Sequence, residues 1–282
     1  MQLDWRCAKC LYERQQEHTD NEDYLAEIGA IIDSRREHDT SPYLTWRFHQ
    51  AYERHFGISP KSYKEEKKQF NDLVLSLEDK LRKQIIESED PLAAAMVYGR
   101  IGNYIDFGAA NCVSEEEFLS LFGKAEFNER DREAFESFKR QCAKARTFLL
   151  IADNCGEIVI DKLFLEQLRK LYPHLEISVM VRGAEAVNDV TAEDAAYVGI
   201  DKYAKIISNG NEIAGTVYEM CSDEAKDALD NTDVILAKGQ GNYESMAAQG
   251  RHIFYSFLCK CDLFTSRYNV PLYTGIFTEE WE

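Results

Sequence analysis

Residues 147–157, Thr-Phe-Leu-Leu-Ile-Ala-Asp-Asn-Cys-Gly-Glu, decide the fold of this chain. The apolar run 148–152 predicts a buried strand that ends at Asp153-Asn154. A turn containing Gly156 follows, and apolar spacing over 158–171 then predicts an amphipathic helix. In an open α/β sheet the ligand crevice lies at the carboxyl ends of the strands. Asp153 and Asn154 are therefore expected at this crevice, as adjacent oxygen ligands of the kind that hard divalent cations prefer.

The pattern of strand, turn and helix repeats to the end of the chain. Because short apolar strands alternate with helical segments, residues 146–282 are expected to form an α/β domain, a Rossmann-like three-layer sandwich with a mostly parallel sheet. Its strands are predicted at 147–152, 177–181, 204–208 and 233–237, with two more at 252–258 and 272–277. The segment 252–258 is ambiguous between strand and helix.

The first half of the chain has a different pattern. Apolar residues spaced three and four apart, with charges between them, predict a helical module over residues 1–145. The clearest helices are expected at 24–36, 43–56, 63–86 and 131–143. Since no linker rich in Gly, Pro or Ser separates the halves, we expect them to pack together.

Composition narrows the class of partner. The 282 residues carry a formal net charge of −17, from 50 acidic and 33 basic residues. An average field of this sign repels nucleic acid and anionic membranes, so neither is expected as a partner. The sequence has neither a run of 18 apolar residues nor a secretory signal, and a cytoplasmic protein is expected.

Eight cysteines in such a chain favour free thiols or metal ligands over a disulfide framework. Cys7 and Cys10 have the spacing of half a zinc site, but no second Cys-x-x-Cys or His pair accompanies them. A structural metal at these two cysteines is left open.

Oxygen-bearing side chains recur where the predicted strands end. Asp189 follows the second strand, and the helix 158–171 should bring it beside Asp153 and Asn154 as a third metal ligand. Glu157 lies at the start of that helix and could act as a general base or order a water molecule.

Cationic and amide donors follow the same strands. Arg182 ends the second strand, Lys238-Gly239-Gln240-Gly241-Asn242 follows the fourth, and Lys260 follows segment 252–258. Such groups can hold an anion. Metal-binding oxygens beside cationic donors are what phosphoryl transfer to water requires, so the sequence predicts a metal-dependent phosphatase.

Each of these motifs has a structural alternative. Asp-Asn before Gly is a common turn composition, Asn188-Asp189 could cap a helix, and Lys238 could be a surface lysine. The convergence of several such turns on one sheet edge favours a site.

Several short motifs together resemble one known family. They are Gly-Asn-Tyr-Ile-Asp-Phe-Gly at 102–108, Asp-Asn-x-Gly-Glu-Ile-Val at 153–159, Asn-Asp-Val-Thr at 188–191, Ser-Asn-Gly at 208–210, Lys-Gly-Gln-Gly-Asn-Tyr-Glu at 238–244, and Lys260-Cys261. In this order they resemble the damage-control phosphatases, which include the acidic-residue methyltransferase-like proteins, over nearly the whole chain. Cys7-x-x-Cys10 resembles the compact prokaryotic branch.

The resemblance implies phosphatases that use Mn, Co, Ni or Mg and act on small phosphorylated metabolites such as sugar phosphates. It implies metal ligands at Asp153, Asn154 and Asp189. It implies phosphate contacts at Lys238, Asn242 or Lys260. Asn103 and Asp106 are candidate substrate contacts, with a polar helix connection as the alternative.

Two other functions compete with this one. A metabolite-binding regulatory protein could use the same sheet edge without a metal. A carboxyl methyltransferase would need a nucleotide-binding Gly-x-Gly-x-Gly turn after the first strand, and this turn is missing from the sequence. The oligomeric state cannot be inferred from the sequence.

Overall fold

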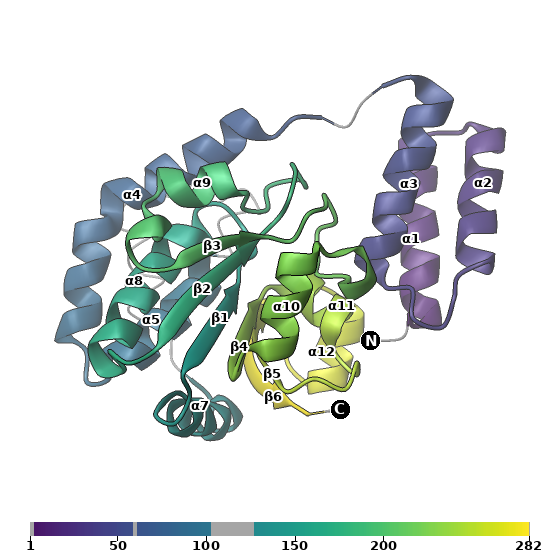
Figure 1. Ribbon diagram of the computed structural model, residues 1–282. Coiled ribbons are helices and arrows are strands. Elements are labelled where there is room, and N and C mark those ends of the chain that lie inside the picture. The colour runs from purple at the N-terminus through teal and green to yellow at the C-terminus, as the bar shows by residue number, and fades with distance from the viewer. Residues whose placement is uncertain (1–2, 59–60, 103–126, 282) are drawn as a thin grey trace.

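A six-stranded sheet forms the centre of the molecule (Figure 1). The computed structural model describes residues 3–58, 61–102 and 127–281. The strand order is β3-β2-β1-β4-β5-β6, and every pairing is parallel except that of β6 with β5. The strands are β1 Thr147–Ile151, β2 Glu176–Val181, β3 Lys205–Ser208, β4 Val234–Lys238, β5 Ile253–Leu258 and β6 Gly275–Glu280.

The predicted strands are confirmed, with one shift at the end of the chain. The ambiguous segment 252–258 is a strand, β5, with every residue of Ile253–Leu258 buried. The last strand begins later than the predicted 272–277. Residues 271–274 instead form a turn, in which the Thr274 N–H donates to the Pro271 carbonyl (3.2 Å) and Tyr273 has a φ of 62°.

Alternating strand residues point to two different cores. Phe148 and Leu150 of β1 contribute to one core, whereas Leu149 and Ile151 contribute to the other. Helices cover both faces, so the predicted three-layer α/β architecture is confirmed. The first face carries α4 Lys64–Glu87, α5 Pro91–Gly102, α7 Glu129–Cys142, α8 Glu157–Leu171 and α9 Ala192–Tyr197; the second carries α10 Asp223–Asn231, α11 Gln240–Met246 and α12 Asp262–Tyr268.

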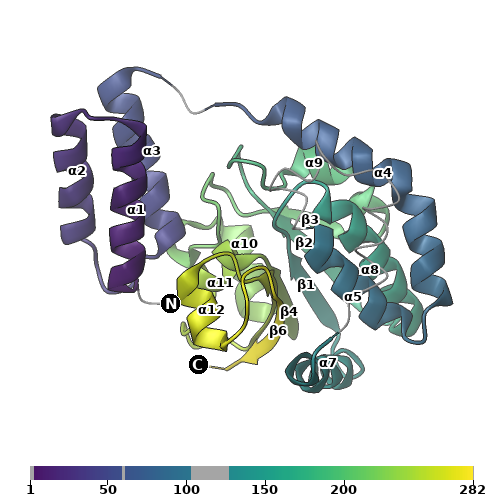
Figure 2. The ribbon, with the colours of Figure 1, turned by 180° about the vertical axis from the view of Figure 1, so that it is seen from behind.

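The first three helices form a bundle with a core of its own. They are α1 Trp5–His18, α2 Glu22–Asp33 and α3 Ser41–Phe56, and their buried side chains include Tyr24, Ile28 and Phe48. This bundle stands beside the sheet, whereas α5 lies against the sheet and α4 packs on α5 and α8 (Figures 1 and 2). The helices before residue 146 thus fall into two groups, and a domain boundary at 145/146 stays a prediction. No helix in the described ranges is both long and apolar enough to span a membrane.

The topology fixes where a ligand crevice should lie. The chain runs from β1 outward to β2 and β3, then returns to β4 on the other side of β1. The carboxyl ends of β1 and β4 therefore border the point where the strand order reverses, which is where doubly wound sheets bind their ligands. Gly239 follows β4 directly, and Asp153 lies two residues after the end of β1.

Candidate functional site

The loops after β1 and β2 are joined by backbone contacts. Asn154 and Asp189 face each other in an isolated antiparallel bridge. The Val190 N–H donates to the Asp153 carbonyl (2.8 Å), and the Cys155 N–H donates to the Asn188 carbonyl (2.9 Å). The predicted proximity of Asp189 to Asp153 and Asn154 is therefore realised. Thr191, with Asp194, forms the capping box of α9, so Asn188 and Asp189 do not act as its N-cap.

Arg182 lies between the two aspartates of this cluster. Its Nε donates to Asp189 Oδ2 (2.6 Å), and one of its terminal nitrogens is 4.0 Å from Asp153 Oδ1. Asn154 Nδ2 donates to Asp153 Oδ2 at 2.9 Å. All four side chains are buried, so the site concentrates two carboxylates, one amide and one guanidinium in a small volume.

The remaining Arg182 nitrogens bind Thr216 and Asn242. The Thr216 hydroxyl accepts from the guanidinium (3.2 Å) and donates to Asn242 Oδ1 (2.9 Å), which also accepts from Arg182 (3.1 Å). Asn242 Nδ2 in turn donates to the carbonyls of Ala152 (3.1 Å) and Lys238 (2.7 Å). Sequence reasoning missed Thr216, because it lies in the irregular connection after β3 and belongs to no motif.

Gly239 allows the β4 loop to approach Asp153. Its φ is 80°, and a Cβ atom added there would lie 1.9 Å from Asp153 Oδ2. Any side chain would therefore collide with the carboxylate, so glycine is required both for the backbone conformation and for the close approach. The helix α11 begins at the next residue and carries Asn242.

Lys238 is buried against two carboxylates of α8. Its Nζ donates to Glu157 Oε1 (2.5 Å) and to Asp161 Oδ1 (2.7 Å), and each of the three residues is at most 2% exposed. Burial raises the pKa of Glu157 to about 8 against the opposing effect of Lys238, and burial likewise raises the pKa of Asp161. Two carboxyl groups share one ammonium group in this triad of Lys238, Glu157 and Asp161. The surroundings therefore favour a proton on one of the two carboxyl groups. Sequence reasoning missed Asp161, although its spacing of four from Glu157 places both carboxylates on one helix face.

The remaining predicted contacts are Lys260, Asn103 and Asp106. Lys260 is half-buried just after β5, and its backbone N–H donates to Gln240 Oε1 (3.0 Å). Asn103 and Asp106 lie outside the described residues. The residue before them, Gly102, packs so closely on α8 that an added Cβ would lie 3.0 Å from Glu157 Cα.

The donor chemistry of the cluster suits a hard divalent cation. Asp153, Asn154 and Asp189 supply carboxylate and amide oxygens, which Mg²⁺ and Mn²⁺ prefer. Over the described ranges no three His, Cys, Asp or Glu side chains are grouped closely enough to hold a metal ion. Asp153 and Asp189 are two residues of these types, and the third oxygen donor, Asn154, is an amide. The same finding leaves a structural metal at Cys7 and Cys10 without support, and the described cysteines are all free thiols.

The molecule is thus an α/β protein with a buried polar cluster where its parallel strand order reverses. The model of the damage-control phosphatase ARMT1-like domain matches residues 5–275. The chain therefore belongs to the damage-control phosphatase family, as its motifs indicated, and is a phosphatase.

Relatives extend over much or nearly all of the chain. An uncharacterized protein of Methanocaldococcus jannaschii is 34% identical over 71% of this chain and 67% of its own length. A damage-control phosphatase of Pyrococcus horikoshii is 33% identical, over 61% of this chain and 59% of the relative. Another, of Archaeoglobus fulgidus, is 27% identical over 93% of each. The crystal structure of a DUF89 family protein from Pyrococcus horikoshii has the same fold, with a TM-score of 0.81, 23% identity and full coverage of both chains.

Proposed function

We propose that this chain hydrolyses phosphate monoesters of small metabolites with the help of a divalent cation, Mn, Co, Ni or Mg, at the carboxyl edge of β1 and β2. The observation that carries the proposal is the convergence of Asp153, Asn154 and Asp189, which the Asn154–Asp189 bridge brings together. Membership of a phosphatase family supports hydrolysis over the regulatory-binding and methyl-transfer alternatives.

These three residues would hold the cation through their oxygens. When bound, such an ion polarises a phosphoryl oxygen and lowers the pKa of water. The amide of Asn154 now donates to Asp153 Oδ2, and rotation of that amide would present its oxygen instead. Arg182 pairs with Asp189 and lies near Asp153, so it offsets part of their charge and fixes the orientation of Asp189.

The triad of Lys238, Glu157 and Asp161 lies next to this cluster. In our proposal Glu157 orders the attacking water or deprotonates it. As a base it must first lose the proton that its raised pKa favours retaining, so the base role requires pH near or above 8 or a nearby cation. Lys238 positions Glu157 through the 2.5 Å contact. Direct contact of Lys238, Gly239, Asn242 or Lys260 with the phosphoryl group stays part of the proposal, and Asn242 also holds Arg182 in place.

The test compares Asp153→Ala with the wild-type protein on p-nitrophenyl phosphate, with and without added Mn²⁺. We expect wild-type hydrolysis to depend on the metal, and Asp153→Ala to lose about 100-fold or more in kcat/KM while remaining folded, since hard cations depend most on carboxylate ligands. Asp79→Ala is the matched control, because the Asp79 side chain is 99% exposed on α4. Near-normal turnover by folded Asp153→Ala would refute the assignment.

A further inference from the structure

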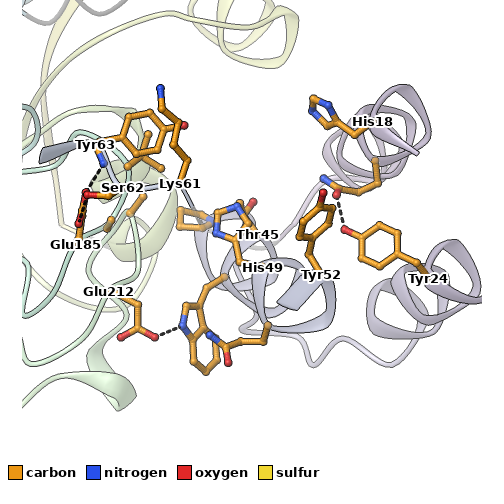
Figure 3. A pocket seen from close by; sticks show the side chains of 17 residues that line it. His18, Tyr24, Thr45, His49, Tyr52, Lys61, Ser62, Tyr63, Glu185 and Glu212 are labelled. Atoms are coloured by element: carbon orange, nitrogen blue, oxygen red, sulfur yellow. Dashed lines mark hydrogen bonds between the residues drawn. The ribbon is translucent and has the colours of Figure 1, made fainter. Parts of the chain in front are cut away.

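A cavity of about 700 Å³ lies between the helical bundle and the α/β part of the molecule (Figure 3). One wall is built by α3 and neighbouring helices, with Thr45 and His49 projecting into the space between Glu212 and Tyr52. The opposite wall comes from residues 185–187 and from residues 212 and 214. The volume is in the range of small-molecule sites.

The opposite wall is formed by two loops, and each loop leads to a residue of the proposed phosphoryl site. Ala186 and Val187 line the cavity and immediately precede Asn188-Asp189, and the Asp189 N–H donates to the Ala186 carbonyl (2.9 Å). The second loop lines the cavity with Glu212 and Ala214 and then continues to Thr216, which binds Arg182. Two short stretches of backbone therefore connect the cavity wall to residues of the proposed phosphoryl site.

A strained residue marks the same junction. Val187 has a φ of 50°, a left-handed conformation that β-branched residues rarely adopt. Such strain persists where the surrounding structure imposes it, and it clusters at ligand sites. Here it lies between a cavity wall and a proposed metal ligand.

Aromatic side chains line part of the cavity. Trp46 of α3 is fixed by a hydrogen bond from its Nε1 to Glu212 Oε1 (2.6 Å), which ties the bundle to the loop that leads to Thr216. Tyr52 and Tyr63 also line the space. Rigid aromatic faces with polar groups between them suit a ring-shaped organic group that carries hydroxyls.

The charge of the wall limits what such a group can carry. Glu185 accepts hydrogen bonds from the Ser62 hydroxyl (3.0 Å) and the Tyr63 N–H, and Glu212 accepts from Trp46. All of these donors are neutral, and within the described ranges neither carboxylate has a cationic partner. Lys61 also lines the cavity, but its ammonium group pairs with Glu66. A ligand with a further anionic group would therefore meet the like charge of Glu185 and Glu212, which is a basis for discrimination.

We propose that this cavity is the subsite for the organic part of the substrate. It would favour a monophosphate of an uncharged, hydroxylated ring over the same ring with an added carboxylate. Trp46 would be a specificity-determining residue, and Glu212 would reject anionic skeletons. This inference rests on the proposed phosphatase site for the placement of the phosphoryl group.

Tryptophan fluorescence tests the cavity without relying on turnover. In a Trp5→Phe, Trp281→Phe background Trp46 is the sole tryptophan. Its emission should change in a saturable manner with neutral ring monophosphates, such as glucose 1-phosphate or inositol 1-phosphate, in the presence of Mg²⁺, but not with inorganic phosphate. Glucuronic acid 1-phosphate, which differs from glucose 1-phosphate by one carboxylate, should bind at least about tenfold more weakly, and Glu212→Gln should narrow that gap.

Kinetics then test specificity on the esters that the enzyme hydrolyses. Trp46→Ala should raise KM for a ring ester about tenfold and leave inhibition by inorganic phosphate unchanged. Trp5→Ala, which removes a tryptophan 68% exposed on α1, should change neither.

The outcomes separate the two proposals. If no ester is hydrolysed but Trp46 responds to ring monophosphates, the phosphatase assignment fails and the cavity stands. If esters are hydrolysed while Trp46 emission responds to none of them, or Trp46→Ala weakens inorganic phosphate as much as ring esters, the cavity inference is overturned. Equal binding of the two glucose-derived esters would overturn the charge discrimination.

Discussion

Arg182 and Asp189 form a buried ion pair, with Arg182 Nε 2.6 Å from Asp189 Oδ2 and the two side chains 1% and 6% exposed. The sequence predicted the arginine as an anion-binding group and the aspartate as a metal ligand. In the structure the cation orients the predicted ligand and links it through Thr216 to Asn242. The orientation of Asp189 as a proposed metal ligand therefore depends on Arg182.

Arg182→Gln should destabilise the protein by about 3–5 kcal/mol, because it leaves the buried Asp189 carboxylate without its partner. Phosphatase kcat/KM should fall at least about 100-fold, since Asp189 and Asn242 both lose their orientation. Urea unfolding and steady-state kinetics measure the two effects, and Arg182→Lys serves if the glutamine variant does not fold.

The matched control is Arg251→Gln, which removes the partly exposed pair with Asp230. Its cost should stay below about 1 kcal/mol, as for other surface pairs. A similar, small loss in both glutamine variants would contradict the role given to Arg182.

Gly239→Ala should abolish most activity through Asp153. The new Cβ would lie 1.9 Å from Asp153 Oδ2, so the carboxylate must move away from Asn154 and Arg182. Gly250→Ala provides the comparison, because Gly250 also has a positive φ, 72°, but has nothing within 4 Å of the added atom. Gly250→Ala should lose about 1–2 kcal/mol from backbone strain. Gly239→Ala should lose at least as much, because its φ of 80° and ψ of 153° are open almost only to glycine, and only this variant should lose activity. Equal activities would mean that the close approach does not matter.

Lys238→Met tests the buried triad. Without the ammonium group, Glu157 and Asp161 lie together in an apolar environment, and we expect destabilisation of several kcal/mol at neutral pH. The combined variant Lys238→Met with Asp161→Asn should recover part of that loss by removing one buried charge. If Lys238 also contacts the phosphoryl group, the combined variant stays poor in kcat/KM while its metal affinity is near normal. An unchanged kcat/KM in a folded variant would leave Arg182 and Lys260 as the phosphate-binding candidates.

The raised pKa of Glu157 predicts how stability depends on pH. Its ordinary value is 4.5 and its value in the fold is about 8, so between these values the folded protein keeps a proton that the unfolded chain has released. The contribution of Glu157 to the free energy of unfolding is fully present below pH 4.5. It is lost as pH rises from 4.5 to 8, at up to about 1.4 kcal/mol per pH unit. Glu157→Gln does not titrate, so the variant should gain stability relative to wild type across this range and reach a plateau above it. Urea unfolding of both metal-free proteins from pH 4.5 to 9 measures the difference, and a constant difference would disprove the shift.

The sequence determined the order of elements and the position of the crevice. Hydrophobic runs such as 148–152 are buried on both faces of a parallel sheet, so they are visible without knowledge of their neighbours. The polar residues Asp153, Asp189 and Lys238 lie at the ends of these runs or in the loops that follow them, and the carboxyl ends of parallel strands share one edge. Their convergence therefore follows from topology alone.

Only the tertiary structure decided which groups pair within that edge. Lys238 binds Glu157 and Asp161, while Arg182 binds Asp189, because burial in a medium of low dielectric constant forces each charge to find a partner, and the packing of α8 against β4 selects which one. Thr216 and Glu212 lie in irregular backbone with no periodic signal, so their contacts with Arg182 and Trp46 could not be inferred from the sequence. The cavity between the bundle and the loops likewise arises from the packing of α3 beside α11, a long-range contact that local patterns do not encode.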